Sequence, residues 1–215
     1  MASLNSLSDL YLHTLRDIHS AEDQITDALP KMAEMATHPE LRQAFEQHRA
    51  QTDEQKRRVE QICEALGKSP KGHKCKGMMG LVEEGREIMK MGGEPDVKDA
   101  AMIGAAQRIE HYEIAAYGCA KTYAKMLGRE QDVRLLQQSE NEEAETDKLL
   151  TRLAERVVNR DALQDVPLAR SAEMGADMRS TGTPAGTSGT TGTAGTSGVG
   201  TNRPRTDEGG MRPGI

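Results

Sequence analysis

The sequence predicts an all-α protein: four long helices that form a bundle, one additional short helix, and a disordered C-terminal tail. Helix-forming residues dominate 7–159, and glycine and proline gather at a few interruptions between the long segments. Within these segments apolar residues recur at alternating steps of three and four, the spacing of one buried helix face. A chain of 215 residues fits one domain of ordinary size with an appendage. We therefore assign 1–160 to the bundle and 161–215 to the tail.

Four interruptions mark the ends of the predicted helices. They are Thr37–Pro39, Gly67–Gly72, Gly92–Pro95 and Gly128, and each contains a residue at which helices commonly begin or end. The third helix is short, and each long helix would span about 40 Å at ~1.5 Å per residue. The five helices are expected at about 7–35, 40–66, 75–91, 97–127 and 130–159.

The tail differs in composition from the rest of the chain. Residues 181–200 consist of Thr, Gly, Ser, Ala, one Pro and one Val. Such a segment has too little apolar surface to offset the entropy lost on ordering it. From 160 onward six Arg balance six Asp and Glu, so the formal net charge of −6 belongs to the bundle.

The stripe of each long helix that should be buried is apolar at its ends and polar in its middle. Glu22, Gln55, Glu110 and Glu143 lie near the midpoints of the first, second, fourth and fifth helices. In an aligned antiparallel bundle these midpoints share one level, so the sequence predicts a polar layer inside the core. His48, the only histidine on a stripe, is expected at the edge of this layer.

Buried carboxylates need a compensating charge. Glutamate is almost never fully buried unless it is paired, and an uncompensated buried carboxylate costs several kcal/mol. The stripes hold no Lys or Arg, so we infer that metal cations compensate the layer. Any single glutamate could instead lie at the rim of its stripe, but four at matching depth argue against that reading: Glu22, Glu110, Glu113 and Glu143. Glu110 and Glu113, at i and i+3, share a helix face, and Asp147 lies one turn after Glu143. The candidate ligands are Glu22, His48, Glu110, Glu113, Glu143 and Asp147.

Composition and charge exclude several classes of protein. An acidic bundle without a basic patch argues against nucleic-acid binding. No apolar run approaches the ~20 residues of a membrane span, and no signal-peptide pattern opens the chain, so we expect a cytoplasmic protein without a membrane segment. Cys63, Cys75 and Cys119 are expected to be reduced thiols. His73 beside Cys75 is a poor metal motif, and Tyr117 is expected to hydrogen-bond a carboxylate of the layer.

Five stretches of the chain resemble the YciF/YciE-like proteins, a family of bacterial ferritin-like proteins associated with stress responses. They are Asp17–Glu22, Glu46–Thr52, Gly67–Gly72, Glu110–Gly118 and Glu142–Asp147. The resemblance covers about 7–159 and does not extend to the tail. It implies a ferritin-like four-helix bundle with an additional helix, and a homodimer.

The wider ferritin-like pattern is one Glu from each of two helices and Glu-x-x-His from each of the other two. Glu22 fits the role of a lone glutamate, but the second helix offers His48 and Thr52 without a Glu-x-x-His on its stripe. The fourth helix offers Glu110-x-x-Glu113 instead. An oxygen-rich, histidine-poor ligand set favours two iron ions, or manganese, over zinc or copper.

Three functions remain open at this stage. The first is a redox-active dimetal protein that oxidises Fe(II) or reduces peroxide or O2. The second is a non-catalytic stress protein that acts as a dimeric interaction module with structural metal or none. The third is a storage cage built from the same bundle. Whether the protein is an enzyme stays open. The short third helix and its Met-rich stretch, from Met78 and Met79 to Met89, are the candidates for the dimer contact.

Overall fold

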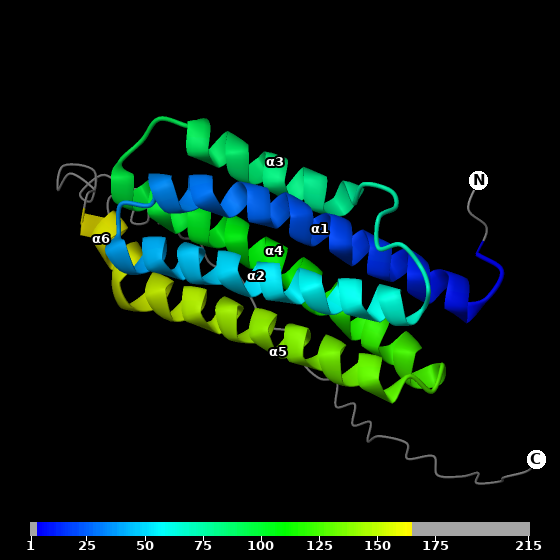
Figure 1. Cartoon of the computed structure of the whole chain (residues 1–215). Coiled ribbons are helices and arrows are strands. Elements are labelled where there is room, and N and C mark those ends of the chain that lie inside the picture. The colour runs from blue at the N-terminus through cyan, green and yellow to red at the C-terminus, as the bar shows by residue number, and fades with distance from the viewer. Residues whose placement is uncertain (1–3, 165–215) are drawn as a thin grey trace, which may run out of the picture. The chain divides into compact units, whose positions relative to one another are not determined.

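A computed structural model describes residues 4–164, and every regular element in that range is helical (Figure 1). The predicted all-α fold is therefore confirmed. The boundary predicted at 160 falls inside the last helix, and the rest of the predicted tail, 165–215, lies outside the described residues. The elements are α1 (Leu7–Met35), α2 (Pro39–Ala65), α3 (Lys76–Lys90), α4 (Pro95–Met126), α5 (Glu130–Leu153), a π-helical turn (Ala154–Val158) and α6 (Asn159–Gln164).

The ends of the helices follow from local chemistry. The Ser6 side chain accepts a hydrogen bond from the backbone N–H of Asp9 at 3.1 Å and caps α1. Pro39 and Pro95 occupy the first positions of α2 and α4, where the missing N–H leaves no bond unmade. Beyond the ends of α2 and α4 the chain turns at glycines with positive φ, 64° at Gly67 and 70° at Gly128. These signals explain why most helix ends could be predicted closely.

The long helices form two antiparallel hairpins, α1 with α2 and α4 with α5, that pack against each other. In Figure 1 α2 and α5 lie side by side, while α3 runs beside α1 in the connection between the hairpins. Arg156 after α5 pairs with Glu40 at the start of α2, and Arg58 near the end of α2 pairs with Glu142 at 2.6 Å. These contacts show that α2 and α5 are antiparallel. The crossover through α3 consequently makes α2 and α4 parallel.

The core consists of two apolar clusters with polar residues between them along the bundle. Both clusters draw on all four long helices, so the predicted apolar ends of the stripes are confirmed. The first cluster includes Leu29, Met32, Leu41, Phe45, Ile103 and Leu153. The second includes Tyr11, Leu15, Ile62, Ala124 and Leu136.

The methionines of α3 do not form the surface expected for a dimer contact. Met78 and Met89 are buried in the core that α3 shares with α1 and α4. Only Met79 among the three candidates is exposed, at 45%. The predicted contact is therefore wrong for Met78 and Met89, because the apolar face of this short helix is already covered within the chain.

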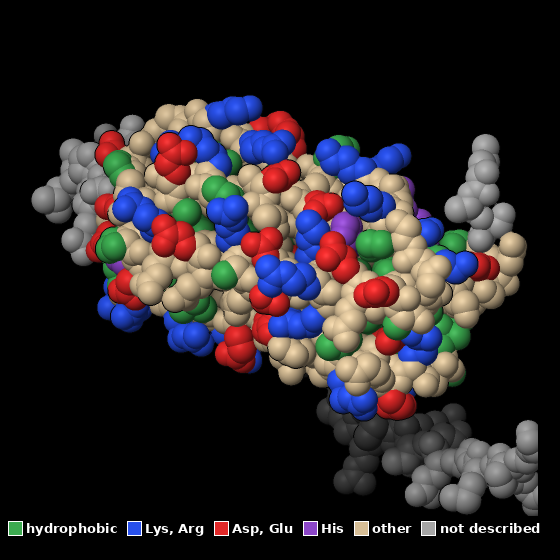
Figure 2. Space-filling model, in the orientation of Figure 1, with side chains coloured by type: hydrophobic (Ala, Val, Ile, Leu, Met, Phe, Trp, Pro, Cys, Tyr) green, Lys and Arg blue, Asp and Glu red, His purple; other side chains and the backbone are tan. Residues whose placement is uncertain are grey.

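The surface of the described bundle carries charges of both signs. On the face shown in Figure 2 acidic and basic side chains are interspersed rather than gathered by sign. Within the described residues no helix is both long enough and apolar enough to cross a membrane.

Candidate metal centre

The polar layer lies where the sequence places it, in the middle of the four long helices. Glu22 of α1, Glu110 of α4 and Glu143 of α5 have no exposed surface. Each interrupts an apolar stripe: in α1, for example, the buried Ile18 and Ile25 flank Glu22 at helical spacing. The stripe must face the core, so packing of the apolar residues carries the carboxylates inside.

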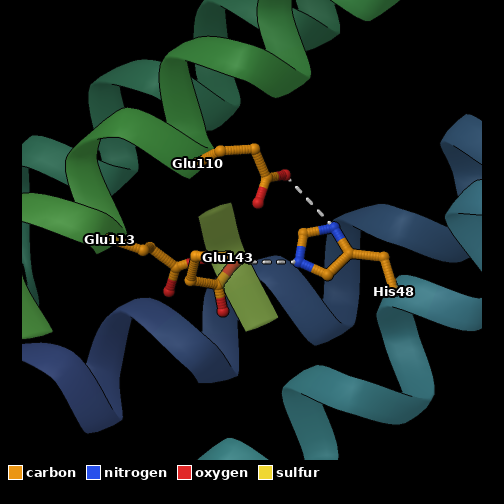
Figure 3. Close-up of side chains that lie close together, drawn as sticks. All are labelled: His48, Glu110, Glu113 and Glu143. Carbon is orange, nitrogen blue, oxygen red and sulfur yellow. Dashed lines mark ion pairs between the residues drawn. The ribbon is translucent and has the colours of Figure 1, made fainter. Parts of the chain in front are cut away.

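Four of these side chains form a compact cluster. His48, Glu110, Glu113 and Glu143 each offer one ligand atom, and these atoms all lie within 4.8 Å of one another (Figure 3). His48 Nδ1 is 3.3 Å from Glu110 Oε1, and its Nε2 is 3.4 Å from Glu143 Oε2. The sequence places His48 at the edge of the layer, whereas in the structure its ring lies inside, between carboxylates of α4 and α5.

Glu22 lies beside this cluster and is held by a tyrosine. The buried Tyr117 hydroxyl donates a hydrogen bond to Glu22 Oε1, as expected from the sequence, and Glu22 Oε2 has no partner. Burial and the charge of Glu143 raise the pKa of Glu22 well above its usual range. The Tyr117 pKa is likewise raised by burial and then by Glu22, so the phenol keeps its proton.

The carboxylates of the layer cannot all ionise without a compensating cation. Burial is the largest cause that raises the pKa values of Glu110 and Glu113, and neighbouring carboxylates raise them further. Both carboxylate oxygens of Glu110, Glu113 and Glu143 are buried and lack a well-aligned hydrogen bond, although one oxygen of Glu110 and one of Glu143 form ion pairs with the His48 ring. Buried polar atoms normally have a partner, so these six oxygens require an explanation.

A bound divalent cation would supply that explanation. Hard carboxylate oxygens with one imidazole match the preferences of iron and manganese. Gln55, fully buried on α2, has no partner for either atom of its amide and offers a further oxygen. The donor set in this structure therefore fits the metals that the sequence indicates.

Asp147 is a predicted ligand that the structure places elsewhere. Its Oδ1 accepts a hydrogen bond from Gln107 Nε2 at 3.0 Å and lies 3.5 Å from His111 Nε2. Its side chain is 21% exposed on the seam between α4 and α5, and it is not a member of the four-residue cluster. Its negative charge still contributes to the raised pKa of Glu110. Asp147 lies one helical turn after Glu143, but its side chain points toward α4 and pairs there with Gln107.

A second polar network was not foreseen from the sequence. Tyr112 of α4 donates to Asp17 Oδ2 of α1 at 2.8 Å, and the Cys75 thiol lies 2.9 Å from the Tyr112 hydroxyl. His73 Nε2 lies 3.0 Å from Asp17 Oδ1. In the described part of the chain His73 and Cys75 join no group of three metal ligands, and they fasten the loop before α3 to α1 instead. No local pattern could reveal contacts between residues so far apart in sequence.

Two antiparallel hairpins joined by one long crossover, with a carboxylate and histidine cluster between the helices, define a ferritin-like protein. Residues 6–163 match the model of DUF892, a domain of unknown function, and the chain belongs to this family. Protein YciF of Escherichia coli (strain K12) is 40% identical over 161 residues, which cover 74% of this chain and 97% of YciF. The predicted kinship with YciF is thus confirmed.

Solved structures agree with this assignment. The crystal structure of the E. coli stress protein YciF matches with a TM-score of 0.70 and 41% identity, covering 72% of this chain and 98% of that chain. YcfI of Rhodopseudomonas palustris, for which a structural role has been suggested, matches with a TM-score of 0.68 and 41% identity, covering 69% and 95%. A protein of Xanthomonas campestris pv. campestris, 20% identical with a TM-score of 0.60, shares the fold over 74% and 99% of the two chains.

Proposed function

We propose that the polar layer binds two iron or manganese ions, and that the protein is a ferritin-like dimetal protein that oxidises Fe(II) or reduces peroxide or O2. The observation that carries the proposal is the set of six buried carboxylate oxygens without hydrogen-bond donors, gathered around one imidazole. Lysine or arginine would be the ordinary compensators, and neither is among the buried side chains of the described bundle.

We assign the candidate ligands to two ions as follows. His48, Glu110, Glu113 and Glu143 would hold one ion, since their ligand atoms lie within 4.8 Å of one another. Glu22 would help to hold the second ion through its unpartnered oxygen, and the unpartnered amide oxygen of Gln55 is a further candidate donor. After burial, the charges of Glu22 and Glu143 raise the pKa of Glu113, so these three carboxylates lie close enough to belong to one layer.

A bound pair of iron or manganese ions would supply electrons to O2 or peroxide, and the chain would control water and protons around it. The two apolar clusters shield the layer from solvent along the bundle. Protonated carboxyl groups must release protons when cations bind, because the ligand is the carboxylate. Tyr117 donates a hydrogen bond to Glu22 and so orients this carboxylate within the layer.

A second candidate is a non-catalytic role. It is favoured by YcfI, a relative at 41% identity for which a structural role has been suggested. Under this alternative the layer would hold metal only to stabilise the bundle, or none. Because E. coli YciF is described as a stress protein, we place either role in a stress response. We further propose a symmetric homodimer, the commonest closed assembly; light scattering that finds a monomer at tens of micromolar would contradict it.

Metal analysis followed by an oxygen assay separates the two candidates. Protein purified without chelator should contain iron or manganese, and it should consume O2 when Fe(II) is added. Glu110→Gln and Glu143→Gln should lose metal, because a neutral amide is a weaker ligand for a hard cation. Glu145→Gln is the matched control, since Glu145 is an exposed residue of α5 that pairs with Lys148. Metal without turnover would support the structural role, and absence of metal from the wild type would refute a metal site.

A further inference from the structure

A cavity of about 480 Å³ lies on the seam between α2 and α5, the two helices seen side by side in Figure 1. Ala44 and Ala50 of α2 line it, and their small side chains leave room between the helices. Gln51 of α2 and Thr146 of α5 line it as well. The cavity is separate from the layer itself, whose ligands do not line it.

The position of the cavity relative to the layer follows from the helical repeat. Gln51 comes three residues after His48, and Thr146 comes three residues after Glu143, so each lies on the same helix face as its partner. His48 Nε2 and Glu143 Oε2 meet at 3.4 Å across the same two helices. The cavity thus lies outside the contact between His48 and Glu143, with Gln51 and Thr146 next to that contact.

One weak hydrogen bond joins the two helices at this point. The Thr146 hydroxyl lies 3.4 Å from Gln51 Oε1, near the upper limit for a hydrogen bond. The hydroxyl has one proton, and its nearer acceptor is the backbone carbonyl of Glu142 at 3.1 Å, so Thr146 keeps a hydrogen bond when the amide moves away. Thr146 is 7% exposed, whereas Glu143 behind it has no exposed surface. Rotation of the Gln51 side chain alone would break the link.

The lining of the cavity suits an uncharged molecule better than a cation. Amide and hydroxyl groups stand nearest the layer. The carboxylate that borders the cavity, Glu145, is exposed and pairs with Lys148 at 2.8 Å, and Arg152 also borders it and would repel a cation. Small polar molecules such as hydrogen peroxide meet hydrogen-bonding groups here without having to shed a charge.

We propose that this cavity admits a small uncharged oxidant, hydrogen peroxide or O2, to the metal-binding layer, and that the Gln51–Thr146 pair controls its passage. The proposal rests on the proposed function, because it assumes a metal in the layer. The seam between α4 and α5, where Asp147 lies, is not part of this route.

Association of nitric oxide with the Fe(II)-loaded full-length protein, followed anaerobically by stopped-flow absorbance, tests the route with a small uncharged probe. Ala50→Phe fills the cavity from an exposed helix position and should slow association about tenfold, equivalent to ~1.4 kcal/mol of barrier. Gln51→Ala removes the polar link and should speed association. Neither variant should change the iron content, because neither residue is a ligand.

Ala115→Phe is the matched control, since Ala115 is an exposed alanine of α4 that does not line the cavity. It should associate with nitric oxide at the wild-type rate. Wild-type rates in both Ala50→Phe and Gln51→Ala, or equal slowing in Ala115→Phe, would overturn the proposed route while leaving the metal site intact. Wild-type protein that takes up no iron and forms no nitrosyl adduct would overturn the proposed function and the route together.

Discussion

Acidification should stabilise the metal-free protein, in contrast to the usual loss of stability at low pH. Burial, followed by neighbouring carboxylates, raises the pKa values of Glu22, Glu110 and Glu113 in the folded state. In the unfolded chain these groups titrate near their ordinary value of about 4.3. Between the two values the folded state binds more protons than the unfolded state, so the free energy of unfolding falls as pH rises and increases as pH is lowered.

The size of the effect depends on how many extra protons the folded layer holds. One extra proton contributes about 1.4 kcal/mol per pH unit, so lowering the pH from about 7.5 to 5.5 adds ~2.7 kcal/mol. For a domain of this size ~1 kcal/mol moves the melting temperature by about 2–4 °C, which predicts a rise of roughly 5–11 °C. Three fully buried carboxyl groups with raised pKa values make one extra proton a conservative figure.

Thermal melting of chelator-treated protein, followed by circular dichroism, measures this dependence. Glu110→Gln should be at least as stable as wild type at pH 7.5 and should show a shallower dependence on pH, because one titrating group is gone. With metal present the sign should reverse, since protons compete with cations for the carboxylates and acid releases the metal.

A flat or falling melting temperature between pH 7.5 and 5.5 would contradict this reasoning, above all if wild type and Glu110→Gln gave the same profile. Such a result would mean that the carboxyl groups ionise as they do in water. The layer would then be hydrated, and the inference of a cation from uncompensated burial would lose its basis.

Three further results are expected. Asp147→Asn should leave the Mn(II) affinity, measured by calorimetry, within about threefold of wild type. Glu110→Gln should weaken that affinity at least about tenfold, or ~1.4 kcal/mol. Equal losses of affinity in the two variants would indicate that Asp147 is a ligand. A thiol reagent should modify the exposed Cys119 rapidly and Cys63 slowly, because burial raises the pKa of Cys63 to about 11; rapid labelling of both in native protein would show that the bundle opens readily. Deletion of 165–215 should shift the melting temperature by less than about 5 °C, a larger drop indicating that the segment packs on the bundle.

The polar layer could be predicted from the sequence because charged residues interrupt stripes that are otherwise apolar and must be buried. Glu22, Glu110 and Glu143 break apolar stripes that must face a core, and the helical repeat alone places all three inside. The direction of a side chain at the margin of a stripe is not contained in that repeat. Asp147 therefore lies on a seam rather than in the cluster, and His48 lies inside rather than at the edge.

Contacts that depend on the tertiary arrangement were beyond the reach of sequence patterns. The bond between Tyr112 and Asp17 joins residues of two helices that only the crossover brings together. The π-helical turn after α5, Ala154–Val158, likewise has no signal in the sequence, whose pattern predicts one uninterrupted helix to 159. The burial of Met78 depends on α3 covering α1 and α4, a packing that its short apolar run does not specify.

The polar layer also separates two apolar clusters that share no side chains. We expect the two ends of the metal-free bundle to differ in local stability as a result. Ligands from both hairpins, such as His48 of α2 and Glu143 of α5, would let one bound cation tie the two ends into a single unit. Bound metal would then make the helices more rigid, and surfaces far from the layer would become less mobile.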